Sequence, residues 1–343
     1  MEIILSKDHL AHFPKGEIYD GQLVRPFECP ERWDHIVNSL NKNGFQTQTK
    51  PNALDTKKLT AVHEEKYVNF LQDCWDEWIF AGYTGEAIPT IFPVRGFTQD
   101  RIPDDIDGKL GYYALAAETS ITEGTWKAAQ ASAAIAQTGQ EKISNGASEI
   151  FALCRPPGHH ASTNQFGGYC FLNNAAVAAQ GMIIDGASKV AILDIDFHHG
   201  NGTQSIFYDR NDVLFVSLHG NPKDAFPYFL GYANETGSGN GDGANLNLPL
   251  DRGTEFNVWV EALKTGLKKI RSHQPEALVV SLGVDTFMND PISFFRLTSE
   301  DYLTIGRLIS DLNIPTLYVM EGGYAVEEIG VNTVNVLLGH LNK

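Results

Sequence analysis

The chain has few cysteines, a deficit of basic residues and no long apolar run, and each of these absences excludes a class of protein. Its four cysteines include no C-x-x-C pair, so the sequence indicates neither a zinc ribbon nor a disulfide framework, and we expect reduced, mostly buried thiols. No stretch approaches the roughly 20 apolar residues that a membrane span requires. The N-terminal residues lack the features of a signal peptide, so we expect a cytoplasmic protein without membrane association.

Acidic residues outnumber basic residues by 42 to 26, which gives a formal net charge of -16. This balance opposes binding to the phosphates of nucleic acids and favours attraction of cations. A small polycationic ligand explains such a surface, and so does adaptation to a salty habitat. The charge alone does not decide between these two explanations.

With 343 residues and 43% hydrophobic content, the chain can bury a large core as a single domain, 1–343. Short β-branched runs alternate with helical patterns, which favours an α/β fold with a mostly parallel sheet. The runs predict strands at 2–5, 150–154, 189–194, 213–218, 277–282 and 316–320. The patterns predict helices at 30–43, 64–81, 123–137, 174–185, 258–272 and 299–313, the last with a capping box of Thr298 and Asp301. Two segments, 82–110 and 221–247, are predicted to be loops near a substrate entrance.

Carboxylates and an imidazole gather where the strand at 189–194 ends. Side chains alternate along an extended chain, so Asp194, Asp196 and His198 project together at the carboxyl end of this strand. Asp285 follows another strand in the same way. Asp196, His198 and Asp285 therefore predict a catalytic zinc site with a position left for water, which Fe²⁺ or Co²⁺ would also suit. The alternative is a hydrogen-bonded network without a metal.

Two imidazoles and a phenol follow other predicted strands. His159 and His160 come after a Pro-Pro-Gly turn and suit proton transfer, because imidazole titrates near neutral pH. A structural role for at least one of them is the alternative. Tyr324 follows two glycines, and its hydroxyl can donate to a developing oxyanion.

Six motifs in order resemble those of the zinc-dependent histone deacetylases and their bacterial relatives. They are RPPGHH at 155–160, FGGYCFLNNAAVAA at 166–179, LDIDFHHGNGTQ at 193–204, SLHG at 217–220, SLGVDTF at 281–287 and MEGGY at 320–324. Within this superfamily, the N-terminal half is most similar to the acetylpolyamine amidohydrolases, through residues 19–21, 26–28, 63–71 and 92–113. The resemblance implies the arginase-deacetylase fold, with a sheet of about eight strands between helix layers. It also implies one deacetylase domain with an inserted entrance and dimerisation segment at about 82–113.

The resemblance assigns roles residue by residue. It implies that Asp196, His198 and Asp285 bind one zinc ion per chain. It implies that Tyr324 polarises the acetyl carbonyl and stabilises the tetrahedral intermediate. His160 would be the general base that then protonates the leaving amine.

Supporting groups are implied in the same way. Asp194 would hold His159, which gives electrostatic support, and Asn201 would face His160. Some deacetylases have aspartate at the position of Asn201. The neutral Asn201 therefore implies a different protonation of His160 in this chain. Two structural K⁺ or Na⁺ sites are also implied, one at Asp194, Asp196, His198, Ser217 and Leu218 and one at Phe207, Arg210 and Val213.

For the substrate, the resemblance implies a narrow apolar tunnel with acidic groups at its mouth. Such a tunnel suits an alkyl amine, whose methylenes lose water while the charged end stays outside. Asp107 stands where the polyamine-specific relatives carry glutamate, which favours longer amines or a water bridge. The implied residues are Gly168, Tyr169, Phe226 and Ile292 in the tunnel and Asp107 and Glu118 at its mouth.

These inferences predict a homodimeric zinc enzyme that removes acetyl groups from small cationic acetylated amines, with no nucleic-acid or membrane partner. A protein or peptide N-acetyl-lysine deacetylase would share every catalytic residue. An arginase-like ureohydrolase is disfavoured, because the motifs supply too few bridging carboxylates for two metal ions. A non-catalytic protein with a structural metal is the remote alternative.

Overall fold

A central sheet of eight parallel strands organises the protein in a computed structural model that describes residues 1–94, 96 and 98–341. Its strands are β1 (Glu2–Ile4), β4 (Gln48–Thr49), β5 (Glu149–Ala152), β6 (Val190–Asp194), β7 (Val213–Gly220), β8 (Asn245–Leu250), β9 (Ala277–Leu282) and β10 (Thr316–Met320). Their order across the sheet is β4-β1-β5-β10-β9-β6-β7-β8. Every neighbouring pair is parallel, so the carboxyl ends of all eight strands share one edge. A small antiparallel hairpin, β2 (Glu17–Tyr19) and β3 (Gln22–Val24), lies outside this sheet.

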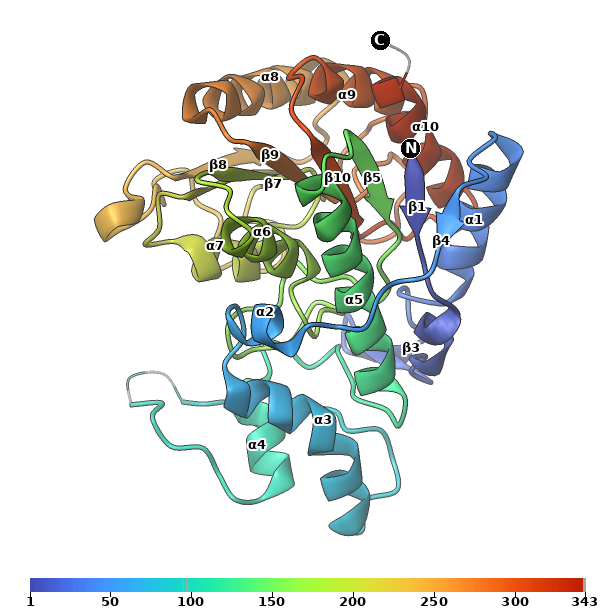
Figure 1. Ribbon diagram of the computed structural model, residues 1–343. Helices are drawn as coiled ribbons and strands as arrows, with labels where there is room; N and C mark the ends of the chain where they lie inside the picture. The colour runs from blue at the N-terminus through green and yellow to red at the C-terminus, as the bar shows by residue number, and fades with distance from the viewer. Residues whose placement is uncertain (95, 97, 342–343) are drawn as a thin grey trace.

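Helices cover both faces of the sheet (Figure 1). On one face lie α1 (Glu31–Lys42), α8 (Phe256–His273), α9 (Asp301–Ser310) and α10 (Ile329–Leu341). On the other lie α5 (Thr125–Ser144), α6 (Asn174–Ile184) and α7 (Asn201–Phe207). The remaining helices are α2 (Thr56–Thr60), α3 (Glu65–Phe80), α4 (Ile106–Tyr113) and the short 3₁₀ helices Lys7–Ala11 and Gly239–Gly241.

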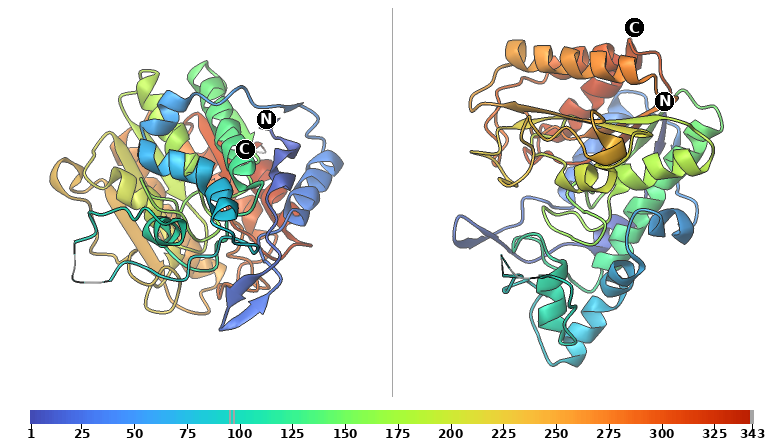
Figure 2. Two further views of the ribbon diagram at one scale, coloured as in Figure 1. Left: turned by 90° about the horizontal axis from the view of Figure 1, so that it is seen from below. Right: turned by 90° about the vertical axis from the view of Figure 1, so that its left-hand side faces the viewer.

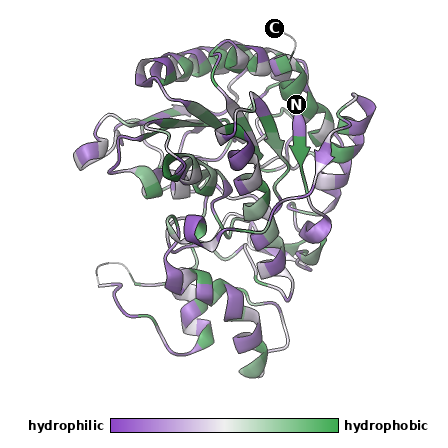
Figure 3. Cartoon of the chain, in the orientation of Figure 1, coloured by the Kyte–Doolittle hydropathy of each residue, from purple (hydrophilic) through white to green (hydrophobic). Residues whose placement is uncertain are grey.

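Alternation along the strands builds one apolar core on each face. In β6, Val190 and Ile192 pack with the α5 and α6 side, whereas Ala191 and Leu193 pack with the α8 and α9 side. In Figure 3 the central strands are largely hydrophobic, and the helices are more hydrophilic on their outer faces. Burial on both faces explains the unbroken apolar runs from which the strands were predicted.

The six predicted strands and six predicted helices are all present, with ends that differ by a few residues. The exception is α5, which continues to Ser144 instead of ending near residue 137. At the predicted capping box, the Asp301 carboxylate accepts the Thr298 N–H at 2.7 Å. The prediction of a loop throughout 82–110 was wrong at its end, where Asp105 caps α4 through the Asp107 N–H. The loop predicted at 221–247 likewise ends early, because β8 begins at Asn245.

The helices α3 and α4 pack together at the end of the molecule opposite α8, with the segment 82–105 between them in the chain (Figures 1 and 2). The Lys109 ammonium pairs with the Glu77 carboxylate at 2.6 Å across the two helices. All four cysteines are buried and free, as predicted. Among the helices of the described residues, none is long and apolar enough to cross a membrane.

Candidate active site

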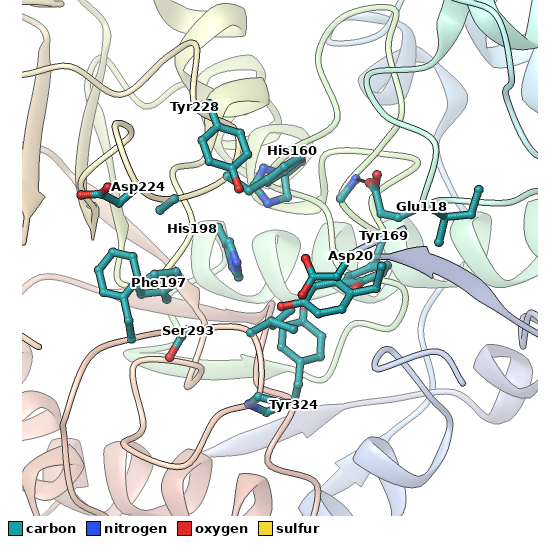
Figure 4. Close-up of a pocket in the computed structure, with 18 of the residues that line it drawn as sticks. Asp20, Glu118, His160, Tyr169, Phe197, His198, Asp224, Tyr228, Ser293 and Tyr324 are labelled. Carbon is teal, nitrogen blue, oxygen red and sulfur yellow. Dashed lines mark hydrogen bonds between the residues drawn. The ribbon is translucent and has the colours of Figure 1, made fainter. Parts of the chain in front are cut away.

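Three neighbouring strands bring the predicted site residues together. The strands β10, β9 and β6 are adjacent and parallel, so the loops that follow them meet at one edge of the sheet. The loop after β6 carries Asp196 and His198, the loop after β9 carries Asp285, and the loop after β10 carries Tyr324. His198 and Tyr324 approach the same pocket from different loops in Figure 4.

Asp196, His198 and Asp285 form a buried cluster. Each offers one ligand atom, and these atoms lie within 4.8 Å of one another. The Nδ1 atom of His198 is 3.3 Å from an Asp196 oxygen and 3.1 Å from an Asp285 oxygen. Backbone N–H groups orient both carboxylates, that of Gly322 toward Asp196 at 2.8 Å and that of Phe197 toward Asp285 at 2.7 Å. The side chains are therefore aimed at one point.

This donor set fits a divalent cation. Two carboxylates are buried side by side, and burial together with the charge of Asp196 raises the pKa of Asp285 to about 8. A cation at the point they share would offset that repulsion. Two oxygens and one imidazole nitrogen suit Zn²⁺, Fe²⁺ or Co²⁺.

The two adjacent imidazoles have different partners. His159 Nδ1 is 3.0 Å from the Asp194 carboxylate, whereas His160 Nδ1 is 2.6 Å from the side-chain oxygen of Asn201. Although burial lowers the pKa of His159, the carboxylates of Asp196 and Asp194 outweigh it and raise that pKa to about 10. Burial, together with the nearby His159 and His198, holds the pKa of His160 well below its ordinary value. His160 is thus the neutral imidazole of the pair.

Tyr324 lies beside a buried arginine. The Arg32 guanidinium donates to the carbonyls of Glu321 at 2.6 Å and Gly323 at 2.7 Å, and it lies 5.0 Å from the centre of the Tyr324 ring. Its charge is balanced by Glu28, at 2.7 Å, which also pairs with Arg155 at 2.8 Å. Burial raises the pKa of Tyr324 well above its ordinary value, so its hydroxyl keeps its proton.

A pocket of about 500 Å³ leads to this cluster. It brings together five of the six predicted substrate residues, with His160, His198 and Tyr324 at its inner end. Asp107 does not line it, because this residue sits in the first turn of α4 in the segment that packs against α3. The predicted residues that do line it are Glu118, Gly168, Tyr169, Phe226 and Ile292.

The part of the pocket wall formed by Gly168 and Tyr169 depends on unusual backbone geometry. Gly168 has φ +56, and a Cβ atom there would lie 2.3 Å from the ring of His160, so only glycine fits. Tyr169 also has a positive φ of 65. Side chains fix this strained segment: the Glu118 carboxylate accepts the Gly168 N–H at 2.7 Å, and the Tyr169 hydroxyl donates to Glu17 at 3.0 Å.

Several site residues were not predicted from the sequence. Asp20 and Asp224 add carboxylates to the pocket wall, and Figure 4 shows them on different sides of it. The Asp20-Gly21 pair, with φ of 48 and 74, turns the β2–β3 hairpin, and this turn signal could have placed Asp20. Other unpredicted residues include Tyr19, Tyr228 and Arg252 in the pocket and Glu17, Arg32 and Asp290 behind it.

The residues of the two predicted alkali-ion sites lie around β6, β7 and α7. Asp194 is directly opposite Ser217 in the paired strands, and Leu218 follows in β7. Phe207 ends α7 and Val213 begins β7, with the Arg210 N–H donating to the Phe207 carbonyl at 3.1 Å between them.

A parallel sheet with a buried Asp-His-Asp cluster at its carboxyl edge, flanked by two imidazoles and a tyrosine, is the arrangement of the arginase-deacetylase fold. The chain belongs to the histone deacetylase domain family, which its residues 26–339 match. It is 56% identical over 99% of both chains to an acetylpolyamine amidohydrolase from Mycoplana ramosa. It is 50% identical, over 99% of this chain and 98% of the other, to acetylpolyamine amidohydrolase 2 from Pseudomonas aeruginosa.

A solved structure supports the same assignment. The crystal structure of acetylpolyamine aminohydrolase from Burkholderia pseudomallei superposes with a TM-score of 0.94 at 36% identity. The match covers 99% of this chain and 98% of the other. The predicted family and fold are therefore confirmed, and the protein is an enzyme of the deacetylase and amidohydrolase type.

Proposed function

We propose that this protein is a zinc-dependent amidohydrolase that removes acetyl groups from acetylated polyamines or diamines and releases acetate and the free amine. The observation that carries this proposal is the pocket, which has carboxylates at its wall and reaches His198, a member of the cluster with Asp196 and Asp285. The names of the similar enzymes from Mycoplana ramosa and Pseudomonas aeruginosa support the choice of substrate.

Asp196, His198 and Asp285 would hold the zinc ion, and Fe²⁺ or Co²⁺ would suit the same atoms. When bound, such an ion polarises a carbonyl group and lowers the pKa of a nearby water molecule. The backbone N–H groups of Gly322 and Phe197 orient the carboxylates that would hold the ion.

His160 is the proposed general base. Asn201 accepts from Nδ1 and donates from its own amide to the His160 carbonyl at 3.4 Å, so the Nδ1 atom carries the proton and Nε2 is free to accept one. Nε2 would take a proton from the attacking water and return it to the leaving nitrogen. His159, paired with Asp194, stays charged beside it and gives electrostatic support.

Tyr324 is the proposed oxyanion donor. Its hydroxyl would donate to the acetyl oxygen, which gains negative charge as water adds to the carbonyl carbon. Because Tyr324 is buried and keeps its proton, this donor is present throughout the neutral pH range.

The walls of the pocket suit a slender cationic chain. Phe226 and Tyr169 are aromatic side chains that could contact the methylenes, and Asp20, Glu118 and Asp224 are carboxylates on the same walls. The net charge of -16 would also draw a polycation toward the protein.

The proposal includes the structural K⁺ or Na⁺ ions. The first would bind at Asp194 and Ser217 with the carbonyls of Asp196, His198 and Leu218, and the second at the carbonyls of Phe207, Arg210 and Val213. The homodimer, the contribution of Asp107, the absence of a nucleic-acid partner and the cytoplasmic location stay predictions.

A comparison of kcat/KM values tests the proposal. The substrates are acetylputrescine, acetylcadaverine, acetylated spermidine and an acetyl-lysine peptide, each assayed with the zinc-loaded enzyme. We expect the small acetylated amines to be hydrolysed at least about tenfold faster than the peptide. A faster peptide reaction would make the protein a lysine deacetylase, and no hydrolysis of any substrate would reject the enzyme assignment.

A further inference from the structure

We propose that Asp290 is a positioning residue that fixes Tyr324 against the metal cluster and so sets the turnover number. The inference rests on the proposed function and adds a residue to it. Asp290 does not contact the substrate pocket, and its carboxylate would act only through the backbone around Tyr324.

The Asp290 carboxylate joins two loops. One of its oxygens accepts the backbone N–H of Tyr324 at 2.7 Å and that of Ala325 at 3.3 Å. The other oxygen accepts the N–H of Ile292, a residue of the pocket wall, at 3.1 Å. Asp290 is only 7% exposed, so these three N–H groups provide the hydrogen bonds that a buried carboxylate needs.

The segment that Asp290 holds has little stiffness of its own. Tyr324 follows Gly322 and Gly323, and Gly323 has a φ of 132, which only glycine adopts easily. Arg32 binds the carbonyls on the N-terminal side of the segment, and Asp290 binds the N–H groups on the C-terminal side. A guanidinium and a carboxyl group from separate elements thus hold the short segment that carries the phenol from its two sides.

Asp290 also links Tyr324 to the metal cluster. It lies five residues after Asp285, in the same loop after β9. The Val284 N–H donates to the Gly322 carbonyl at 3.0 Å and joins the same two loops at a second point. The distance between the Asp285 carboxylate and the Tyr324 hydroxyl therefore depends on these bonds. A misplacement of about 1 Å in such a donor can cost on the order of 100-fold in rate.

Asp290→Asn tests the inference at constant size. An amide has one acceptor oxygen, so it cannot accept from both Ile292 and Tyr324. We expect kcat to fall about 10- to 100-fold, with KM changed less than about threefold and metal content unchanged. The loss should be similar for an acetylated diamine and an acetyl-lysine peptide, because Tyr324 would contact the acetyl group that they share.

A double-mutant cycle separates positioning from general stability. If Asp290 acts through the Tyr324 hydroxyl, Asp290→Asn should lower kcat less than about twofold in a Tyr324→Phe background. The control is Asp185→Asn, which removes a carboxylate that accepts from Lys58 at 2.8 Å and Gln140 at 2.7 Å, away from the pocket. Its effect should be small and equal in both backgrounds.

Equal losses from Asp290→Asn in the two backgrounds, or a loss confined to KM, would overturn the inference. If Asp290→Asn does not fold, Asp290→Glu keeps a carboxyl group but shifts it by one methylene, and it goes through the same cycle with the same criterion. A parent enzyme that hydrolyses neither substrate would instead reject the proposed function.

Discussion

The side-chain oxygen of Asn201 lies 2.6 Å from Nδ1 of His160, whereas the neighbouring His159 faces the carboxylate of Asp194 at 3.0 Å. A neutral partner thus supports one imidazole and a charged partner supports the other. The difference favours imidazolium at His159 and neutral imidazole at His160. The pair therefore combines a fixed positive charge with a proton acceptor.

Replacement of Asn201 by aspartate should change the pH dependence. A carboxylate beside Nδ1 stabilises the protonated form of His160 and raises its pKa, so a higher pH is needed to free Nε2 as a base. We expect the acid limb of the kcat/KM profile of Asn201→Asp to move upward by about one pH unit or more. Profiles of parent and variant that superpose would show that His160 does not act as the base.

Removal of the Tyr324 hydroxyl should affect the chemical step alone. A single oxyanion donor contributes about 100-fold or more to kcat, so Tyr324→Phe should lose at least that factor. Metal content should stay at the parent level, because the hydroxyl is not among the three clustered groups. Equal turnover in variant and parent would remove the proposed role.

Asp20→Asn should weaken the binding of cationic substrates. Asp20 is exposed on the pocket wall, where an ion pair contributes modestly, so we expect KM for an acetylated diamine to rise about two- to fivefold. A neutral N-acetylalkylamine of the same length should keep its KM. The control is Asp34→Asn on the exposed side of α1, which changes the net charge equally. An equal rise in KM for the cationic and the neutral substrate would mean that Asp20 does not recognise the charge of the substrate.

Glu17 should make folding stability depend on pH. Burial is the main reason that the pKa of Glu17 rises from 4.5 to about 7. Hydrogen bonds from Tyr169 and Phe27 lower this pKa, whereas the nearby Glu118 and Glu28 carboxylates raise it further. Between those values the folded protein holds a proton that the unfolded chain has lost, so the free energy of unfolding falls as pH rises through that window.

The Glu17→Gln variant keeps an acceptor for the Tyr169 hydroxyl and removes this titration. Denaturant unfolding at pH 5 and pH 8 should show the variant gaining stability relative to the parent at the higher pH. The same difference in unfolding free energy at both pH values would contradict a buried, protonated Glu17.

The sheet was predictable where burial is complete. Strands such as Val190–Asp194 are covered on both faces, and their continuous apolar residues stand out in the sequence. By contrast, β8 carries Asn245 and Asn247 on one side, where both bind Gln204, and the same residues in a sequence favour a loop. The two residues of β4 are too few to show a period.

The candidate site divides in a similar way. Asp196, His198 and Asp285 were predicted because each follows a recognisable strand, and strands of a parallel sheet end at one edge. The residues that support the site through hydrogen bonds from behind it could not be recognised from their place in the sequence. Arg32 and Gly323, or Glu17 and Tyr169, meet only through the tertiary fold, and no sequence spacing relates them.

Metal analysis of purified protein tests the central claim most directly, with activity measured on the same samples. We expect one divalent ion per chain in the parent, loss of both the ion and hydrolysis in His198→Ala and after chelation, and recovery in the chelated parent when zinc is returned. A His198→Ala variant that retains one ion per chain, or a metal-free parent that still hydrolyses its substrate, would contradict the account.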